Sequence, residues 1–299
     1  MDIITTNSIC IDDLLTRFLR YIDVSELTAK SYKEGIQLFI LYLNGRTPTR
    51  EEVLGYKEYL INNCKPTTVN ARLTAIKQFF KWLSYERIYP NIAENVKQVK
   101  IGEIQKNYPV LEEIHMIIKS INDNYDKALF MLLIGTGIRL KEAMCANIED
   151  IKELHGEKVL YVQGKGRVGK EEYVKLSNSV LEALNGLIME RKHGAIFLST
   201  SNQNRGERAS TRALYNRVKK IYKNAGIDEK KFTCHALRGS FSVLAMENGA
   251  SIYEVSKVLR HKSINTTECY LRSLDRTKNK TEYIVGKVLE VWWKMKKLW

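Results

Sequence analysis

The chain has 299 residues, of which 44% are hydrophobic, so it can bury a substantial core, and its length favours two domains. Its 48 lysines and arginines outnumber its 34 aspartates and glutamates, and the net charge of +14 favours a polyanionic partner such as nucleic acid. No apolar run is long enough to span a bilayer, and the five scattered cysteines argue against a disulfide framework or a zinc site, so we expect a cytoplasmic protein without a metal or other cofactor.

The first hundred residues predict a helical bundle. Amphipathic patterns indicate helices over residues 11–22 and 27–43. Thr49 and Glu52 have the spacing of a capping box, which indicates the start of a third helix. Pro66 suits the first turn of a fourth helix that extends to about Tyr85.

The fourth helix combines an apolar stripe with a polar stripe that contains no carboxylate. Solvated helix faces usually mix both charge signs, whereas hydroxyls, amides and lysines together suit a DNA groove or a phosphate backbone. A solvated face is the simpler alternative. The candidate DNA contacts on this helix are Thr67, Asn70, Thr74, Lys77 and Lys81.

The second half of the chain mixes helices and strands. Residues 92–108 form a basic connection, after which helices are expected over 111–121 and 125–134. Alternating patterns over 158–162 and 172–176 predict a β-hairpin, because a glycine-rich segment separates them. The pattern then indicates a helix over 178–191, a short strand over 195–198 and helices to the end of the chain.

A second basic helix is expected over residues 210–225. No acidic residue occurs from Arg208 through Ile227, so this helix is the other candidate DNA-facing surface, again with a solvated face as the alternative. Its candidate DNA contacts are Arg212, Arg217 and Lys220.

The most specific feature is an ordered set of polar residues in the second half. It begins in Gly135-Thr-Gly-Ile-Arg139-Leu-Lys-Glu142, continues in Gln163-Gly-Lys165-Gly and His235-Ala-Leu-Arg238, and closes in Leu259-Arg-His261-Lys-Ser and Thr266-Thr-Glu-Cys-Tyr270. Any one of these residues has an ordinary explanation. The joint, ordered occurrence of all of them favours a shared chemical task.

These residue types match the needs of metal-free phosphodiester cleavage. Tyr270 can attack phosphorus, and Arg139 and Arg238 can each make a two-pronged contact with phosphate oxygens. His235 and Arg238 lie three positions apart, which places them on one side of a helix. His261 can donate to the same phosphate, and Lys165 can protonate the leaving oxygen.

The ordered set resembles the signature of the tyrosine recombinases, the phage-integrase and Xer family. The resemblance implies a mainly α fold with a small antiparallel sheet, in which an N-terminal helical bundle and a mixed α+β catalytic domain close as a C-shaped clamp around DNA. The expected boundaries are 1–91 for the helical DNA-binding domain, 92–108 for the linker, 109–280 for the catalytic domain and 281–299 for a C-terminal helix. In the family pattern Arg139, Lys165, His235, Arg238, His261 and Tyr270 form the active set, and Glu142 supports the first arginine.

The resemblance also implies a function. Four copies would act on two duplex sites with inverted repeats, through a 3′-phosphotyrosine link and a Holliday junction, in integration, excision or resolution. Two alternatives remain open: an enzyme that relaxes supercoils, like a type IB topoisomerase, and a non-catalytic DNA-binding protein.

Three positions leave questions at the sequence level. Arg260 stands where the family usually has glycine, so it must fit a tight turn or contact DNA. Lys170 is an alternative to Lys165 as the hairpin lysine, and Cys234 beside His235 is expected to be an inert thiol rather than a nucleophile. The apolar stripe of residues 281–299 packs either on its own domain or on a neighbouring copy.

Overall fold

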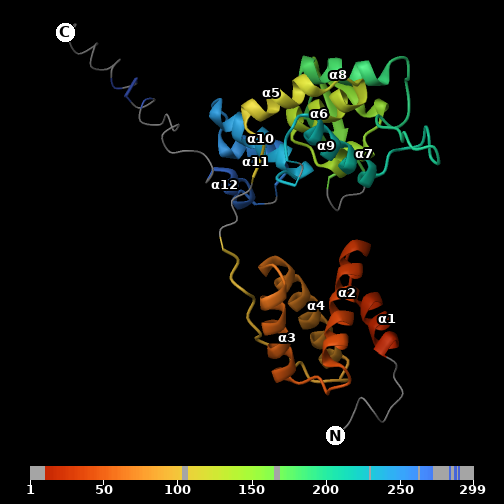
Figure 1. The fold of residues 1–299 in the computed structure, drawn as a ribbon, viewed down its shortest axis with the longest axis vertical. Coiled ribbons are helices and arrows are strands. Elements are labelled where there is room, and N and C mark those ends of the chain that lie inside the picture. The colour runs from red at the N-terminus through yellow and green to blue at the C-terminus, as the bar shows by residue number, and fades with distance from the viewer. Residues whose placement is uncertain are drawn as a thin grey trace. The chain divides into compact units, whose positions relative to one another are not determined.

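The computed structural model describes residues 11–102, 107–164, 169–228, 230–261 and 263–271, with 283, 286, 287 and 289 from the C-terminal segment. At 269–271 the description covers the helical backbone. The chain divides into two compact units, Met1–Ile104 and Gln105–Trp299 (Figure 1). The described part is mainly helical with one small antiparallel sheet, which confirms the fold class expected from the sequence. No helix in these described ranges is long and apolar enough to cross a membrane.

The N-terminal unit is built from α1 (Ile11–Tyr21), α2 (Glu26–Leu43), α3 (Arg50–Asn63) and α4 (Pro66–Tyr85). Thr49 begins α3 as expected, because its hydroxyl accepts the backbone N–H of Glu52. The Glu52 carboxylate accepts Arg46 Nη1 at 2.8 Å. The helix therefore starts where the capping pattern predicted it.

Helix α4 supplies much of the N-terminal core. The apolar stripe predicted from spacing is buried, and Phe79 and Trp82 on its flank are buried as well. Helix α2 packs closely on α4 at Gly35, where a Cβ would lie 3.1 Å from the Ala75 Cβ. The core continues past α4, because Ala93 and Val96 are also buried in it. Part of the segment expected as a linker thus packs with the N-terminal unit.

The described part of the second unit begins with a run of helices and a three-stranded antiparallel sheet, followed by further helices. The elements are α5 (Leu111–Ser120), α6 (Asn124–Thr136), α7 (Leu140–Cys145), the short 3-10 helix η1 (Ile148–Asp150), β1 (Ile151–Leu154), β2 (Glu157–Val162), β3 (Glu172–Lys175), α8 (Asn178–Ile188), α9 (Thr211–Asn224), α10 (Cys234–Glu247), α11 (Ile252–Val258) and α12 (Asn265–Leu271).

The sheet has the order β1-β2-β3, with both pairs antiparallel. Strand β1 was not expected from the sequence. It is joined to β2 by His155 and Gly156, whose φ angles of 50° and 78° are those of a two-residue turn that twists with its strands. The expected strand at 195–198 is wrong: Ala195 and Leu198 form only isolated bridges, to Asn147 and Arg208.

Helix α6 lies at the centre of the second unit. Ala128, Leu129, Phe130, Leu132 and Leu133 are all at most 1% exposed, so the helix is buried around most of its circumference. Helices α8, α9 and α10 pack on it (Figure 1). Its C-terminal end is therefore a rigid starting point for the segment that carries Arg139.

Candidate active site

The segment 135–142 makes a sharp corner between α6 and α7. Gly137 ends α6 with φ 62°, a left-handed conformation that glycine adopts without steric cost. A Cβ at this position would lie 2.7 Å from Leu259 Cδ2 and 2.8 Å from Phe241 Cδ1. Glycine is therefore required here both by the turn and by the close approach of α10 and the end of α11.

Arg139 stands at the N-cap of α7, three residues before Glu142. The Glu142 carboxylate turns back and accepts the Arg139 backbone N–H at 2.8 Å, which satisfies a donor that the helix leaves free. The same carboxylate accepts Arg139 Nη1 at 2.7 Å. The spacing of this motif thus orients both the backbone and the guanidinium of Arg139.

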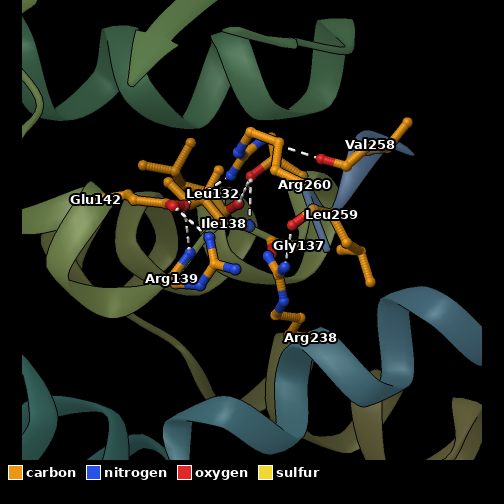
Figure 2. A network of polar contacts seen from close by, with 10 residues as sticks. Leu132, Gly137, Ile138, Arg139, Glu142, Arg238, Val258, Leu259 and Arg260 are labelled. Carbon is orange, nitrogen blue, oxygen red and sulfur yellow. Dashed lines mark hydrogen bonds and ion pairs between the residues drawn. The ribbon is translucent and has the colours of Figure 1, made fainter. Parts of the chain in front are cut away.

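Glu142 is shared by two arginines. Its side chain is only 4% exposed, and Oε2 also accepts Arg260 Nη2 at 2.7 Å. Figure 2 shows the carboxylate between the two guanidinium groups. The Arg139 side chain is 27% exposed, whereas that of Arg260 is 9% exposed. Arg139 is accordingly the more accessible of the two to a ligand.

Arg260 and His261 lie in the turn that ends α11. The Arg260 N–H donates to the Lys257 carbonyl at 2.9 Å, and the His261 N–H donates to the Ser256 carbonyl at 3.1 Å. These two bonds form a Schellman motif, in which the residue at position 260 is left-handed and usually glycine. Arg260 has φ 54°, which costs a non-glycine residue about 1–2 kcal/mol. The turn expected here is therefore present with an arginine in the glycine position.

Arg238 is almost fully buried, at 1% exposure. From α10 its guanidinium donates to the Gly137 carbonyl at 2.5 Å and to the Leu259 carbonyl (Figure 2). His235, three residues earlier on the same helix, is exposed. Arg238 thus ties the Arg139 corner to the His261 turn, and its expected contact with phosphate stays a prediction.

His261 also connects to the helix that carries Tyr270. Its Nδ1 lies 2.7 Å from the hydroxyl of Thr267, a fully buried residue of α12. Helix α12 packs on α10 and α11. The backbone of Tyr270 lies in α12, and its side chain lies outside the described residues. Arg139 and Arg260 are thus linked through Glu142, and the next residue, His261, is hydrogen-bonded to α12, the helix that contains the Tyr270 backbone.

The hairpin lysines have different surroundings. Lys165 lies outside the described residues. The Lys170 amine donates to the Cys145 carbonyl at 2.8 Å and forms an ion pair with Asp150. Lys170 is thereby engaged by its own domain, which supports the choice of Lys165.

Some side chains of the polar stripe on α4 form hydrogen bonds within the protein. Asn70 donates to the Val99 carbonyl at 2.9 Å and accepts the Val99 N–H at 2.8 Å. The Thr74 hydroxyl accepts a hydrogen bond from Gln98 at 3.2 Å. Thr67 and Lys81 are exposed, and Lys77 is half-buried. Asn70 and Thr74 hold the segment after α4, so we leave them out of the proposed DNA interface.

Helix α9 likewise has one candidate residue that is engaged within the protein and two that are exposed. Arg217 donates to Asp123 at 2.6 Å, pairs with Asp126, and stacks over the Tyr125 ring at 4.0 Å. Burial raises the pKa of the Tyr125 hydroxyl to about 12. Arg217 therefore cross-links α9 to α6, and it too is left out of the interface. The Arg212 and Lys220 residues are exposed.

The Cys234 thiol is buried, and burial raises its pKa to about 11. At neutral pH almost none of it is the nucleophilic thiolate. This supports the expectation of an inert thiol beside His235.

The chain matches two family models. Residues 109–277 match the phage integrase family, and residues 13–89 match the phage integrase N-terminal SAM-like domain. Among curated relatives, the tyrosine recombinase XerA of Pyrococcus horikoshii is 27% identical over 267 residues, which cover 87% of this chain and 89% of that protein. The tyrosine recombinase XerD of Oceanobacillus iheyensis is 30% identical, with 83% and 88% covered.

Solved structures support the fold. The lambda integrase dimer bound to a COC′ core site superposes with a TM-score of 0.72 at 18% identity, covering 90% of this chain and 80% of that one. The lambda integrase tetramer bound to a Holliday junction gives a TM-score of 0.69 at 19% identity, covering 89% and 78%.

Proposed function

The chain belongs to the phage integrase family of tyrosine recombinases, and we propose that it cleaves and rejoins DNA at specific sites through a covalent link between Tyr270 and a 3′ phosphate. The single observation that carries this proposal is the connection from Arg139 to the helix of Tyr270: Arg139 and Arg260 share Glu142, and His261, the residue after Arg260, is hydrogen-bonded to Thr267 of that helix. This connection joins a phosphate-binding cation, a histidine and the nucleophile-bearing helix at one corner of one unit.

The proposed reaction is a transesterification. The Tyr270 oxygen attacks phosphorus, the bond to the 5′ oxygen breaks, and Lys165 gives that oxygen its proton. Arg139 and His261 stabilise the charge on the non-bridging oxygens. Arg238 adds a buried positive charge and holds the two turns that carry these groups, and exposed His235 is positioned to donate to the phosphate. The new 5′ hydroxyl of a partner strand then displaces Tyr270.

The proposed substrate is double-stranded DNA with inverted-repeat core sites. The lambda integrase structures, described as a dimer on a core site and a tetramer on a Holliday junction, support a homotetramer on two sites that exchanges strands through such a junction. Both units would contact the duplex, with residues 1–91 and 109–280 as the DNA-binding and catalytic domains. We assign the remaining surface contacts to Thr67, Lys77, Lys81, Arg212 and Lys220.

A two-stage experiment tests this function. Footprinting on DNA that flanks the encoding gene locates the site, and a nicked suicide substrate carrying that site then traps the covalent adduct. The wild-type chain should form the adduct, and Tyr270→Phe should bind the DNA with nearly unchanged affinity and form none, because only the hydroxyl is lost. An adduct that persists in Tyr270→Phe would contradict the assignment.

The same substrates distinguish the two alternatives. A non-catalytic DNA-binding protein would bind the site and form no adduct. An enzyme of the topoisomerase type would form the adduct and relax supercoils but would not exchange strands between two sites. Recombinant products from two labelled duplexes are therefore the decisive readout.

A further inference from the structure

Arg260 occupies a backbone position that favours glycine, and it does so with a nearly buried side chain. Arg87 is also an arginine with positive φ, at 56°, but its side chain is exposed. A left-handed arginine is therefore tolerated elsewhere in this chain without a special role. The distinguishing feature of Arg260 is its guanidinium, which donates to Glu142 at 2.7 Å and to the Val258 carbonyl at 3.0 Å.

We propose that Arg260 is a positioning residue for strand cleavage, which acts on Arg139 through their shared partner Glu142. The inference rests on the proposed function and deepens it. Arg260 reaches Oε2 of the carboxylate, while Oε1 receives the Arg139 guanidinium (Figure 2). Removing Arg260 would leave Oε2 held only by the Arg139 backbone N–H, so the carboxylate, and with it the Arg139 guanidinium, would be less firmly oriented.

Charge gives Arg260 a second effect on the same site. Glu142 alone would neutralise Arg139, so that this pair would carry no net charge. With Arg260 the three side chains carry a net charge of +1, and their burial reduces screening by water. The carboxylate thereby orients Arg139 without cancelling its attraction for an anionic oxygen.

Arg260 also joins this cation pair to His261. The two residues are adjacent in the Schellman turn, and His261 contacts Thr267 of α12. A shift of the Arg260 side chain would therefore also change the position of the turn that contains His261. A glycine at position 260 would keep the turn and lose the tie to Glu142.

The experiment compares Arg260→Gly and Arg260→Lys with the matched control Arg87→Gly, which relieves the same backbone conformation on an exposed site. Single-turnover adduct formation is measured at saturating protein on two suicide substrates, one with the natural phosphate and one with a neutral methylphosphonate at the cleaved position. Arg260→Gly should cleave the phosphate on the order of 10- to 100-fold more slowly. The deficit should shrink to less than about threefold on the methylphosphonate, where no anionic charge needs balancing.

The other two variants distinguish loss of the Arg260 side-chain contacts from a general effect of glycine on folding. Arg260→Lys keeps the charge and should recover part of the rate, and Arg87→Gly should cleave at the wild-type rate. A wild-type rate for Arg260→Gly, or an equal loss on both substrates, would overturn the proposal.

A second readout does not depend on cleavage. In NMR spectra of the full chain without DNA, Arg260→Gly should shift the Arg139 Nε–H and His261 ring signals, and Arg87→Gly should leave both in place. If the wild-type chain forms no adduct, the proposed function fails, while these signals still decide whether Arg260 positions Arg139 and His261. Unchanged signals in Arg260→Gly would overturn the positioning role.

Discussion

Two basic residues of α9 illustrate how differently neighbouring charges are used. Arg217 is enclosed by two carboxylates and an aromatic ring, whereas Lys220 is exposed on the helix surface. The sequence alone does not distinguish these two residues, because both belong to the same basic stretch. The distinction matters because Arg217 could contact a phosphate only by breaking its ion pair with Asp126.

Arg217→Ala should lower the free energy of unfolding by about 2 kcal/mol, because it leaves the buried Asp126 carboxylate without its partner. Lys220→Ala should change the free energy of unfolding by less than about 0.5 kcal/mol. It should weaken DNA binding and reduce, by about 1, the magnitude of the slope of the logarithm of the binding constant against the logarithm of the salt concentration. Urea unfolding and salt-dependent binding measure the two effects. An Arg217→Ala variant that keeps full stability and loses DNA affinity would reverse the assignment.

The hairpin lysines provide the second residue-scale prediction. Lys165→Ala should slow cleavage sharply, and a substrate with a 5′-bridging sulfur should restore the rate, because sulfur leaves without a proton. Lys170→Ala is the matched control and should show no such rescue, since its amine is engaged by Asp150 and the Cys145 carbonyl. Rescue of Lys170→Ala alone would move the general acid to that residue.

At the scale of elements, the site is built from helix ends. The corner between α6 and α7 carries Arg139, and the turn that ends α11 carries Arg260 and His261. Backbone groups that the helices leave free at these ends make several of the hydrogen bonds that hold the corner and the turn. Arg238 bridges two of the ends by donating to the carbonyls of Gly137 and Leu259. The site therefore depends on turn geometry as much as on side-chain chemistry.

Gly137→Ala tests this dependence. The new Cβ would meet Leu259 and Phe241 at under 3 Å in a left-handed turn, so the variant should lose about 2–4 kcal/mol of stability. Gly156→Ala is the matched control: its φ is 78°, and nothing lies within 4 Å of the added Cβ. It should lose only the backbone cost of about 1–2 kcal/mol. Equal losses in thermal unfolding would show that packing at the α6–α7 corner is looser than the distances indicate.

At the scale of the whole molecule, each unit has its own hydrophobic core, and both units carry exposed basic residues, such as Lys81 and Arg212. The helix expected at 281–299 lies largely outside the described residues. Its apolar stripe keeps both interpretations from the sequence: packing on its own domain, or docking on a neighbouring copy.

Truncation after Lys280 distinguishes these interpretations. If the stripe docks on a neighbour, the truncated chain should bind a single half-site with nearly full affinity, and cooperative assembly on two half-sites and recombination should weaken. Burial of several large side chains would contribute several kcal/mol, at roughly 25 cal/mol per Å², less the cost of ordering. Gel-shift titrations on one and two half-sites measure the difference. A truncated chain that assembles at full strength, or that unfolds, would contradict docking on a neighbour.

The sequence by itself determined the helical N-terminal unit, the hairpin and the order of the candidate active set. These features rest on local rules: the 3.6-residue period of α4 and the capping of α3 by Thr49 are both legible within a few positions. The strand at 151–154 was missed, because its short polar pattern carries little signal outside the His155-Gly156 turn. The family pattern also identified Arg260 as a departure.

Only the tertiary structure decided which polar side chains form hydrogen bonds or ion pairs within the protein. Asn70 meets Val99 29 residues away, Arg217 meets Asp126 91 residues away, and Arg260 meets Glu142 118 residues away. Local periodicity shows which face of a helix is polar, but it carries no information on which distant element will cover that face. A buried charge or hydrogen-bonding group is stabilised only when such a partner is present, so packing rather than local pattern decides which partners these three side chains have.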